Sequence, residues 1–122
     1  MPDGDAKFGD VYWVSKEATE HPARVGKPAR PMACMAERRD DTVWSGLPRV
    51  TSDAKPEDQP SRAMPDIHAT RLSDAGWWTA RYIHPVHKDV TGQSGMCEYL
   101  GKLPTDEVKV AREVYRGRLY DS

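Results

Sequence analysis

Short apolar runs separated by turn-forming residues recur along this chain, and they predict a protein built mainly of β-strands. Residues 8–14 are rich in β-branched and aromatic side chains with alternating faces, so they should form the first strand. Residues 32–35 and 43–50 are two further apolar runs, with a charged, turn-prone segment at 37–41 between them. This order is typical of a β-hairpin, which we predict over residues 26–52.

The predicted register of this hairpin brings candidate chemistry together at its open end. With the turn centred between Asp40 and Asp41, Arg30 lies opposite Thr51 and close to Arg49 and Ser52. A guanidinium would then face hydroxyl groups. Pro48 indicates an edge, a bend or a bulge, because a proline cannot donate a hydrogen bond within a sheet. The plain alternative is that Arg30 is a solvated cation at a strand end and that Thr51 and Ser52 only begin a loop.

The remaining chain predicts loops, further strands and one helix. Residues 15–28 show neither helical nor strand periodicity and should form a long, mobile loop. Residues 53–66 are polar and proline-spaced, which favours a flexible surface loop. The other expected elements are a two-stranded meander from residues 67–72 and 77–84, a turn at 73–76 and a last strand at 96–100.

The C-terminal segment predicts an amphipathic helix that begins after Thr105. Thr105 can act as the N-cap, and acidic residues follow it in the first turn, as the helix dipole prefers. Val108, Ala111 and Tyr115 recur at helical spacing. We therefore expect one face of this helix to pack on the sheet.

Composition limits the class of protein. The 122 residues, with 38% hydrophobic and 30% charged side chains, suit one domain over residues 1–122. The net charge of −1 gives no general attraction to nucleic acid or to acidic membranes, although basic residues outnumber acidic ones around the predicted hairpin. Cys34 and Cys97 are too few for a secreted disulfide scaffold and are expected to be small buried residues.

Targeting and cofactor signals are not evident in the sequence. No apolar run is long enough to span a bilayer, and the first five residues are acidic where a signal peptide would be basic, so we expect a cytoplasmic protein with no membrane association. No phosphate-binding glycine loop is present, so a nucleotide cofactor is not indicated.

Two aromatic and histidine features need separate interpretation. The adjacent Trp77 and Trp78 must face opposite sides of a strand, so one should fill the core while the other meets solvent, a partner, a base or the C-terminal helix. The spacing of His84 and His87 could begin a metal site, but no second pair of ligands accompanies them. We therefore expect no metal.

Several short motifs, in order along the chain, give it a resemblance to a known family. The strand Gly-Asp-Val-Tyr-Trp-Val at 9–14 is followed by a long loop, by Arg30 and a proline opening an apolar second strand, and by Thr51 and Ser52 closing the third. Leu-Gly-Lys-Leu at 100–103 then precedes a short helix. Over nearly its whole length, the chain resembles the MazF/PemK family of toxin endoribonucleases.

This resemblance implies a fold, an activity and a set of partners. The expected fold is mainly β with α additions: a small, curved antiparallel sheet or SH3-like barrel with a C-terminal helix. The expected activity is metal-independent cleavage of single-stranded RNA, generally messenger RNA. The expected partners are a cognate antitoxin protein and a second copy of the chain in a homodimer.

The resemblance also assigns residues. The family's catalytic arginine corresponds to Arg30, and its catalytic threonine or serine corresponds to Thr51, with Ser52 adjacent. The family commonly has a glycine and one or two basic residues before Arg-Pro, whereas residues 26–29 here read Gly-Lys-Pro-Ala, so Arg24 and Lys27 are further candidates. The residues expected to contact RNA are Arg24, Lys27, Arg49, His84, His87 and Lys88.

The chemistry of RNA cleavage suits these side chains. Attack of a ribose 2′-hydroxyl on the neighbouring phosphate builds negative charge on the phosphoryl oxygens, which the guanidinium of Arg30 could stabilise. Because a guanidinium stays protonated near neutral pH, Arg30 is a poor general base. Thr51 or Ser52 could donate a hydrogen bond or relay a proton. His21, in the flanking loop, carries an imidazole that could serve in acid/base catalysis.

Two other functions remain open from the sequence. The chain could be a binding module that kept the barrel without the activity and contacts protein or nucleic acid, or a nuclease that uses His21 with His84 or His87. A positively charged groove with Arg30 beside Thr51 or Ser52 would favour the endoribonuclease that uses Arg30. A groove filled by the loop at 15–28 would favour the binding module.

Overall fold

The computed structural model describes residues 6–36, 42–51, 58–67, 72–79 and 82–121, of which residue 36 and residues 118–121 are described by backbone alone. The helices and strands of this part of the chain, in order, are β1 (Asp10–Ser15), η1 (Lys16–Ala18), α1 (Pro22–Val25), β2 (Ala29–Ala36), β3 (Val43–Val50), β4 (Gln59–Ser61), β5 (Gly76–Trp78), β6 (His84–His87), η2 (Lys88–Val90), β7 (Cys97–Lys102) and α2 (Thr105–Asp121). The η elements are short 3₁₀ helices.

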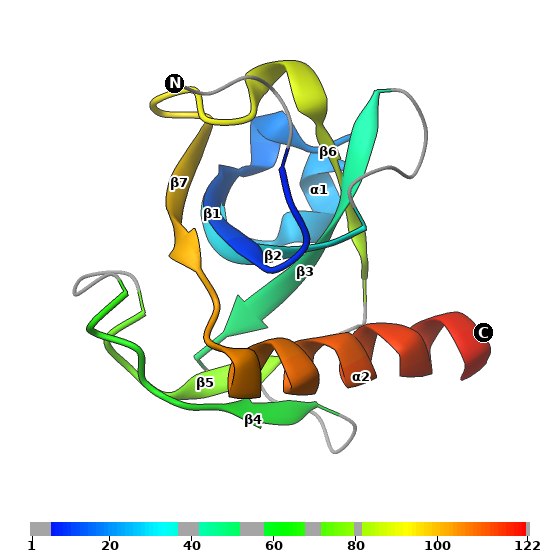
Figure 1. Ribbon diagram of the computed structural model, residues 1–122. Helices are drawn as coiled ribbons and strands as arrows, with labels where there is room; N and C mark the ends of the chain where they lie inside the picture. Colours follow the sequence, from blue (N-terminus) through cyan, green and yellow to red (C-terminus); the bar gives the residue numbers. More distant parts are fainter. Residues whose placement is uncertain (1–5, 37–41, 52–57, 68–71, 80–81, 122) are drawn as a thin grey trace.

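A strongly curved antiparallel sheet forms the body of the protein, and α2 lies along one side of it beside β4 and β5 (Figure 1). The strand order is β4-β5-β3-β2-β1-β7, and β6 also pairs with β3. On the edge away from β2, β3 pairs with β6 through residues 43–46 and with β5 through residues 49–50. β3 therefore joins the curved sheet to the short β4–β5 pair.

Pro48 stands at the point where β3 changes partner. Its carbonyl accepts the backbone N–H of Thr79 at 3.1 Å, so its nitrogen faces the same edge, between the stretches paired with β6 and β5. A proline costs no sheet hydrogen bond at such a junction. The prediction that Pro48 marks an irregular position in the strand is confirmed.

The central strands of the sheet are buried on both faces, which explains why they read as nearly continuous apolar runs. Alternate residues of β1 and β2 belong to two separate clusters. The cluster toward α2 includes Val11, Ala33, Met35, Leu47, Trp78, Ala111 and Val114. The cluster on the other face includes Tyr12, Val14, Ala18, Val25, Met32, Cys34, Trp44, Val86 and Cys97.

Several predictions from the sequence are confirmed. The first strand, the hairpin of β2 and β3, the last strand and the C-terminal helix all form. Ala111 and Val114 of α2 are buried against the sheet. Cys34 and Cys97 are both buried, and they do not form a disulfide. Trp78 is completely buried and Trp77 is only half-buried, as opposite faces of one strand require.

Other predictions are wrong. The meander of residues 67–72 with 77–84 is not found among the described residues, because β5 pairs with β4 and β3 instead. Residue 67 and residues 72–74 lie in a turn and a bend, and residues 68–71 and 80–81 of this prediction lie outside the described residues. The segment predicted as a flexible loop at 53–66 contains β4 and the fully buried Met64; its residues 53–57 lie outside the described residues. The loop at 15–28 contains η1 and α1, although neither has the length to show a periodicity.

Within the described residues, none of the helices combines the length and the apolar character that a membrane crossing needs.

Candidate functional site

A pocket of about 140 Å³ lies where the start of β2 meets the end of β3. Its walls come from the end of α1 with the following Gly26, from the strands β2 and β3, and from Thr79, Tyr82 and the first residue of β6. Its lining residues are Arg24, Val25, Gly26, Arg30, Pro48, Val50, Thr79, Tyr82 and His84. None of these described residues carries a carboxylate, so the pocket is positively charged.

Arg30 is anchored in the wall of this pocket. Its Nε donates to the backbone carbonyl of Val25 at 2.7 Å. The carbonyl is in place because α1 ends at Val25 and Gly26 adopts a left-handed conformation with φ of +78°, which turns the chain toward β2. A Cβ at Gly26 would lie 3.6 Å from Nη2 of Arg30, so the backbone passes close to the guanidinium. A fixed guanidinium needs little reordering to bind an anion.

His84 supplies a neutral imidazole to the same pocket. The residue is only 3% exposed. Burial, and then the positive charges of Arg30, Arg24 and His21, lower the pKa of His84 from 6.5 to about 4. At neutral pH its ring is therefore uncharged, and one ring nitrogen can accept a proton or a hydrogen bond.

Tyr82 stands at the pocket beside Arg24. Tyr82 is 50% exposed, and the Arg24 guanidinium carbon lies 5.6 Å from the centre of its ring. This is cation–π distance. The rings of Tyr82 and His84 are tilted by 46° with centroids 6.4 Å apart. Aromatic and cationic groups are thus interleaved along one wall.

The segment between β1 and β2 forms one wall of the pocket and does not fill it. The N–H of Lys16 donates to the carbonyl of Pro28 at 2.9 Å, which closes the segment at its base. The N–H of Glu20 donates to the carbonyl of Pro85 in β6 at 3.0 Å. These bonds place α1, and with it Arg24, beside β6.

Thr79, and not Thr51, is the threonine that lines the same pocket as Arg30. Ala36 pairs with Ser45, as the predicted register requires. A bulge between Cys34 and Ala36 then shifts the register of the remaining pairs by one residue. Met32 consequently pairs with Pro48.

Continued by two residues, this observed register puts Arg30 opposite Val50, and both line the pocket. Thr51 is an exposed bend residue after β3 and does not line the pocket. The predicted pairing of Arg30 with Thr51 is therefore wrong, because a shift of one residue moves a side chain to the other face of a strand. Ser52 lies outside the described residues.

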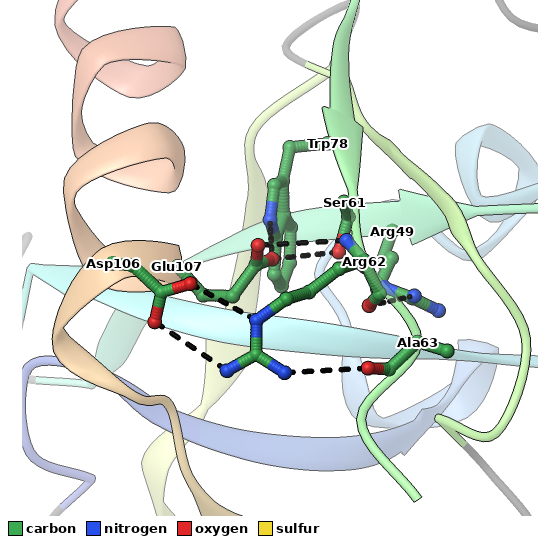
Figure 2. A network of polar contacts seen from close by, with 7 residues as sticks. All are labelled: Arg49, Ser61, Arg62, Ala63, Trp78, Asp106 and Glu107. Carbon is green, nitrogen blue, oxygen red and sulfur yellow. Dashed lines mark hydrogen bonds and ion pairs between the residues drawn. The ribbon is translucent and has the colours of Figure 1, made fainter.

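Arg49 does not belong to the pocket, so it is removed from the predicted RNA-binding set. The residue is 2% exposed, and its Nε donates to Ser61 Oγ at 2.7 Å (Figure 2). Its Nη2 donates to the carbonyls of Arg62 and Asp74 at 3.0 and 2.7 Å. Burial lowers the pKa of Arg49, and the nearby negative charges of Glu107 and Asp74 oppose this shift.

The same network ties β4 and β5 to α2. Ser61 Oγ donates to Glu107 Oε1 at 2.8 Å, and Trp78 Nε1 donates to the same oxygen at 3.0 Å (Figure 2). Glu107 is 4% exposed and lies in the first turn of α2. The Arg49–Ser61–Glu107 chain of contacts is therefore structural, and it holds the strand that leads directly to Thr79.

The other predicted site residues lie around the pocket or away from it. His21 is exposed at the N-terminus of α1 and close enough to contribute to the lowered pKa of His84. Lys27 is exposed in the connection from α1 to β2. His87 stands three residues beyond His84 in β6, on its opposite face, and Lys88 begins η2; neither lines the pocket.

Thr79 and Tyr82 are the pocket residues that sequence reasoning missed. They fall between β5 and β6, in a segment predicted to be continuous strand. The only sequence signal was their closeness to His84. No group of three or more His, Cys, Asp and Glu side chains in the described part of the chain is placed to hold a metal ion.

Comparisons with known proteins add evidence on the fold. No family model matches the chain, and no curated protein matches it. A chain of the crystal structure of MazE-MazF (Form-II) from Deinococcus radiodurans is similar in structure, with a TM-score of 0.59. The match covers 97% of this chain and 97% of that chain, at 15% sequence identity. The protein therefore has a MazF-like fold, mainly antiparallel β with one C-terminal helix.

Proposed function

We propose that this chain is a toxin-like endoribonuclease that cleaves single-stranded RNA, messenger RNA in particular, without a metal ion. The observation that carries the proposal is the pocket itself, in which Arg24 and Arg30 surround the neutral imidazole of His84. The MazF-like fold adds support. The low sequence identity of the structural neighbour means that the activity must be argued from these side chains.

Arg30 is the group that stabilises the transition state. The 2′-oxygen attacks phosphorus and the bond from phosphorus to the 5′-oxygen breaks, which leaves a 2′,3′-cyclic phosphate and a 5′-hydroxyl. Negative charge grows on the phosphoryl oxygens during this step. A permanently charged guanidinium fixed by its bond to Val25 can hold two of these oxygens at once.

The protons are handled by His84, Thr79 and His21. The neutral ring of His84 can accept the proton of the 2′-hydroxyl, and the hydroxyl of Thr79 takes the role that the sequence assigned to Thr51 by donating a hydrogen bond to the phosphate. The leaving 5′-oxygen takes its proton from His21 or from water. This assignment combines the predicted arginine mechanism with part of the histidine alternative.

The proposed partners follow from the fold. The similar chain belongs to a structure of MazE-MazF, which supports an antitoxin protein as the regulator of this chain. A homodimer and a cytoplasmic location belong to the same proposal. An antitoxin segment that binds the positively charged pocket would exclude RNA from it.

The second candidate function is a binding module without catalytic activity. The absence of Thr51 from the described pocket favours this alternative, because the hydroxyl expected from the resemblance is not beside Arg30. A module would still bind RNA or an acidic protein through Arg24 and Arg30. Cleavage is what separates the two functions.

The test is incubation of the purified protein with a long unstructured RNA in EDTA, followed by analysis of the cut positions and end groups. We expect cleavage with 2′,3′-cyclic phosphate and 5′-hydroxyl ends. Arg30→Ala should lower the cleavage rate by about 10²-fold or more, because it removes the main charge-stabilising group. Arg62→Ala, which removes an exposed arginine outside the pocket, should leave the rate unchanged.

Three results would overturn the catalytic proposal. They are loss of all cleavage in EDTA, equal rates for wild type and Arg30→Ala, and RNA binding with no cleavage. Thermal unfolding of each variant would show that a lost rate does not come from a lost fold.

A further inference from the structure

Tyr82 combines exposure with a position at the pocket. Three large hydrophobic residues in the described part of the chain are exposed: Phe8 at 37%, Tyr82 at 50% and Tyr99 at 55%. Of these, only Tyr82 lines the pocket that contains Arg30. Tyr99 packs its ring against Tyr12 on β1, with centroids 5.4 Å apart, and so supplies a natural control.

The ring of Tyr82 is held by its neighbours. The Arg24 guanidinium carbon lies 5.6 Å from the ring centre, and the His84 ring lies on a tilted plane beside it. A guanidinium over a tyrosine is attracted by the electrons of the ring and limits its rotation. An ordered aromatic side chain loses little conformational freedom when a flat ligand packs against it.

The chemistry around Tyr82 fits a nucleotide. A flat, half-exposed aromatic surface lies next to two guanidinium groups, in a pocket whose described lining has no carboxylate. A base can stack on the aromatic ring while the adjoining phosphate binds the cations, which is the combination that single-stranded nucleic-acid sites use. An acidic peptide would pair with Arg24 and Arg30 but has no general need for a flat aromatic surface.

We propose that Tyr82, ordered by Arg24, forms a subsite that stacks one base of single-stranded RNA beside the phosphate held by Arg30. The choice of RNA as ligand rests on the function proposed above. In this subsite, Tyr82 is the side chain that positions the base next to the reacting phosphate. Because every base has a flat face, Tyr82 gives affinity and position with little sequence preference.

The test measures binding without cleavage. Fluorescence anisotropy follows labelled octamers of 2′-O-methyl oligouridylate and oligoadenylate, which lack the attacking 2′-hydroxyl. Tyr82→Ala should weaken binding by about 5-fold to 100-fold, the range expected for loss of one base–aromatic stack. Tyr82→Phe should bind within about twofold of wild type, because the ring is kept. Tyr99→Ala removes an exposed tyrosine that does not line the pocket and should bind like wild type.

A set of octamers with a single abasic position locates the stacked base. At one position, loss of the base should weaken binding by wild type but not weaken binding by Tyr82→Ala any further, because the two changes remove the same contact. Equal binding by wild type and Tyr82→Ala, or equal losses for Tyr82→Ala and Tyr99→Ala, would overturn the subsite. Absence of RNA binding by wild type would also overturn it and would favour a protein ligand.

The two proposals fail separately. If wild type binds the octamers through Tyr82 but never cleaves RNA, the catalytic proposal is wrong and the subsite stands. If wild type cleaves RNA and Tyr82→Ala binds and cleaves equally well, the subsite is wrong and the catalytic proposal stands.

Discussion

The imidazole of His84 lies in an environment very different from that of an ordinary exposed histidine. It is buried beside Arg24 and Arg30, with His21 nearby, so every neighbouring charge disfavours its protonation. The lowered pKa of His84 has two consequences. In the proposed catalysis its neutral ring accepts a proton at neutral pH, and in folding it links stability to pH.

The stability of the protein should fall as the pH is lowered from about 6.5 to about 4. In this window the histidine of the unfolded chain binds a proton, whereas His84 in the folded chain, with a pKa of about 4, does not. The unfolded state therefore binds more protons, and the contribution of His84 to the free energy of unfolding decreases by at most about 3 kcal/mol across this window. Urea unfolding of wild type and of His84→Gln at several pH values measures this.

The variant should lose less stability than wild type across that window, since it carries no imidazole at position 84. Parallel curves for the two proteins would mean that other groups, and not His84, set the pH dependence.

Residue identity was predicted better than residue position. The Arg-Pro pair at the start of the second strand pointed to Arg30, which does line the pocket. Thr51 was misplaced because the bulge between Cys34 and Ala36 takes up one residue of the hairpin. Nothing in an apolar run such as 32–35 marks where a bulge will form, since both faces of this strand are buried and an apolar residue suits either.

At the scale of elements, α2 is joined to the sheet by a buried polar network as well as by apolar packing. Glu107 accepts hydrogen bonds from Ser61 in β4 and from Trp78 in β5. Asp106, its neighbour in the same helical turn, pairs with the exposed Arg62 at 2.9 Å. Two adjacent carboxylates thus occupy very different environments.

Glu107→Ala should lower the free energy of unfolding by about 3 kcal/mol, because it leaves buried donors on Ser61 and Trp78 unpaired and removes the negative charge near Arg49. Asp106→Ala makes the same charge change at the same helix end and should stay close to wild type, because its ion pair is exposed to solvent. Chemical denaturation of both variants gives the comparison. Similar losses of unfolding free energy for the two variants would show that the carboxylates stabilise the protein through the helix dipole and not through the network.

The elements predicted correctly are those with a strong local pattern. β1, β2, β3 and α2 each carry a long alternating, apolar or helical signal. The three-residue β4 contains Pro60 and has no pattern of its own, and it forms because Gln59 and Ser61 find partners in β5. β5 then takes β4 and β3 as neighbours, so the local meander expected for it could not form.

At the scale of the whole molecule, the net charge of −1 contrasts with the local positive charge of the pocket. The protein as a whole does not attract a polyanion, so RNA affinity must come from the few cations near the pocket, chiefly Arg24 and Arg30 with Lys27 adjacent. Few phosphates should therefore be neutralised. The overall fold was predicted from ordered motifs along the whole chain, whereas this concentration of charge needed the folded structure.

The salt dependence of RNA binding should be shallow. For two or three phosphate contacts on a single strand, a plot of log affinity against log salt concentration should have a slope of about −1.4 to −2.1. Arg24→Gln should reduce the slope by about 0.7, because one contact is lost. Anisotropy titrations at several salt concentrations measure both slopes. A much steeper slope would place most of the RNA outside this pocket.

The segment between β1 and β2 leaves and rejoins the sheet at neighbouring positions, since Ser15 pairs with Ala29 and Lys16 bonds to Pro28. Ala18 and Val25 fix it to the core from inside. Such a segment is suited to grafting. A foreign peptide of similar length that keeps both ends and both buried residues would present new side chains to the ligand while every strand of the scaffold keeps its partner.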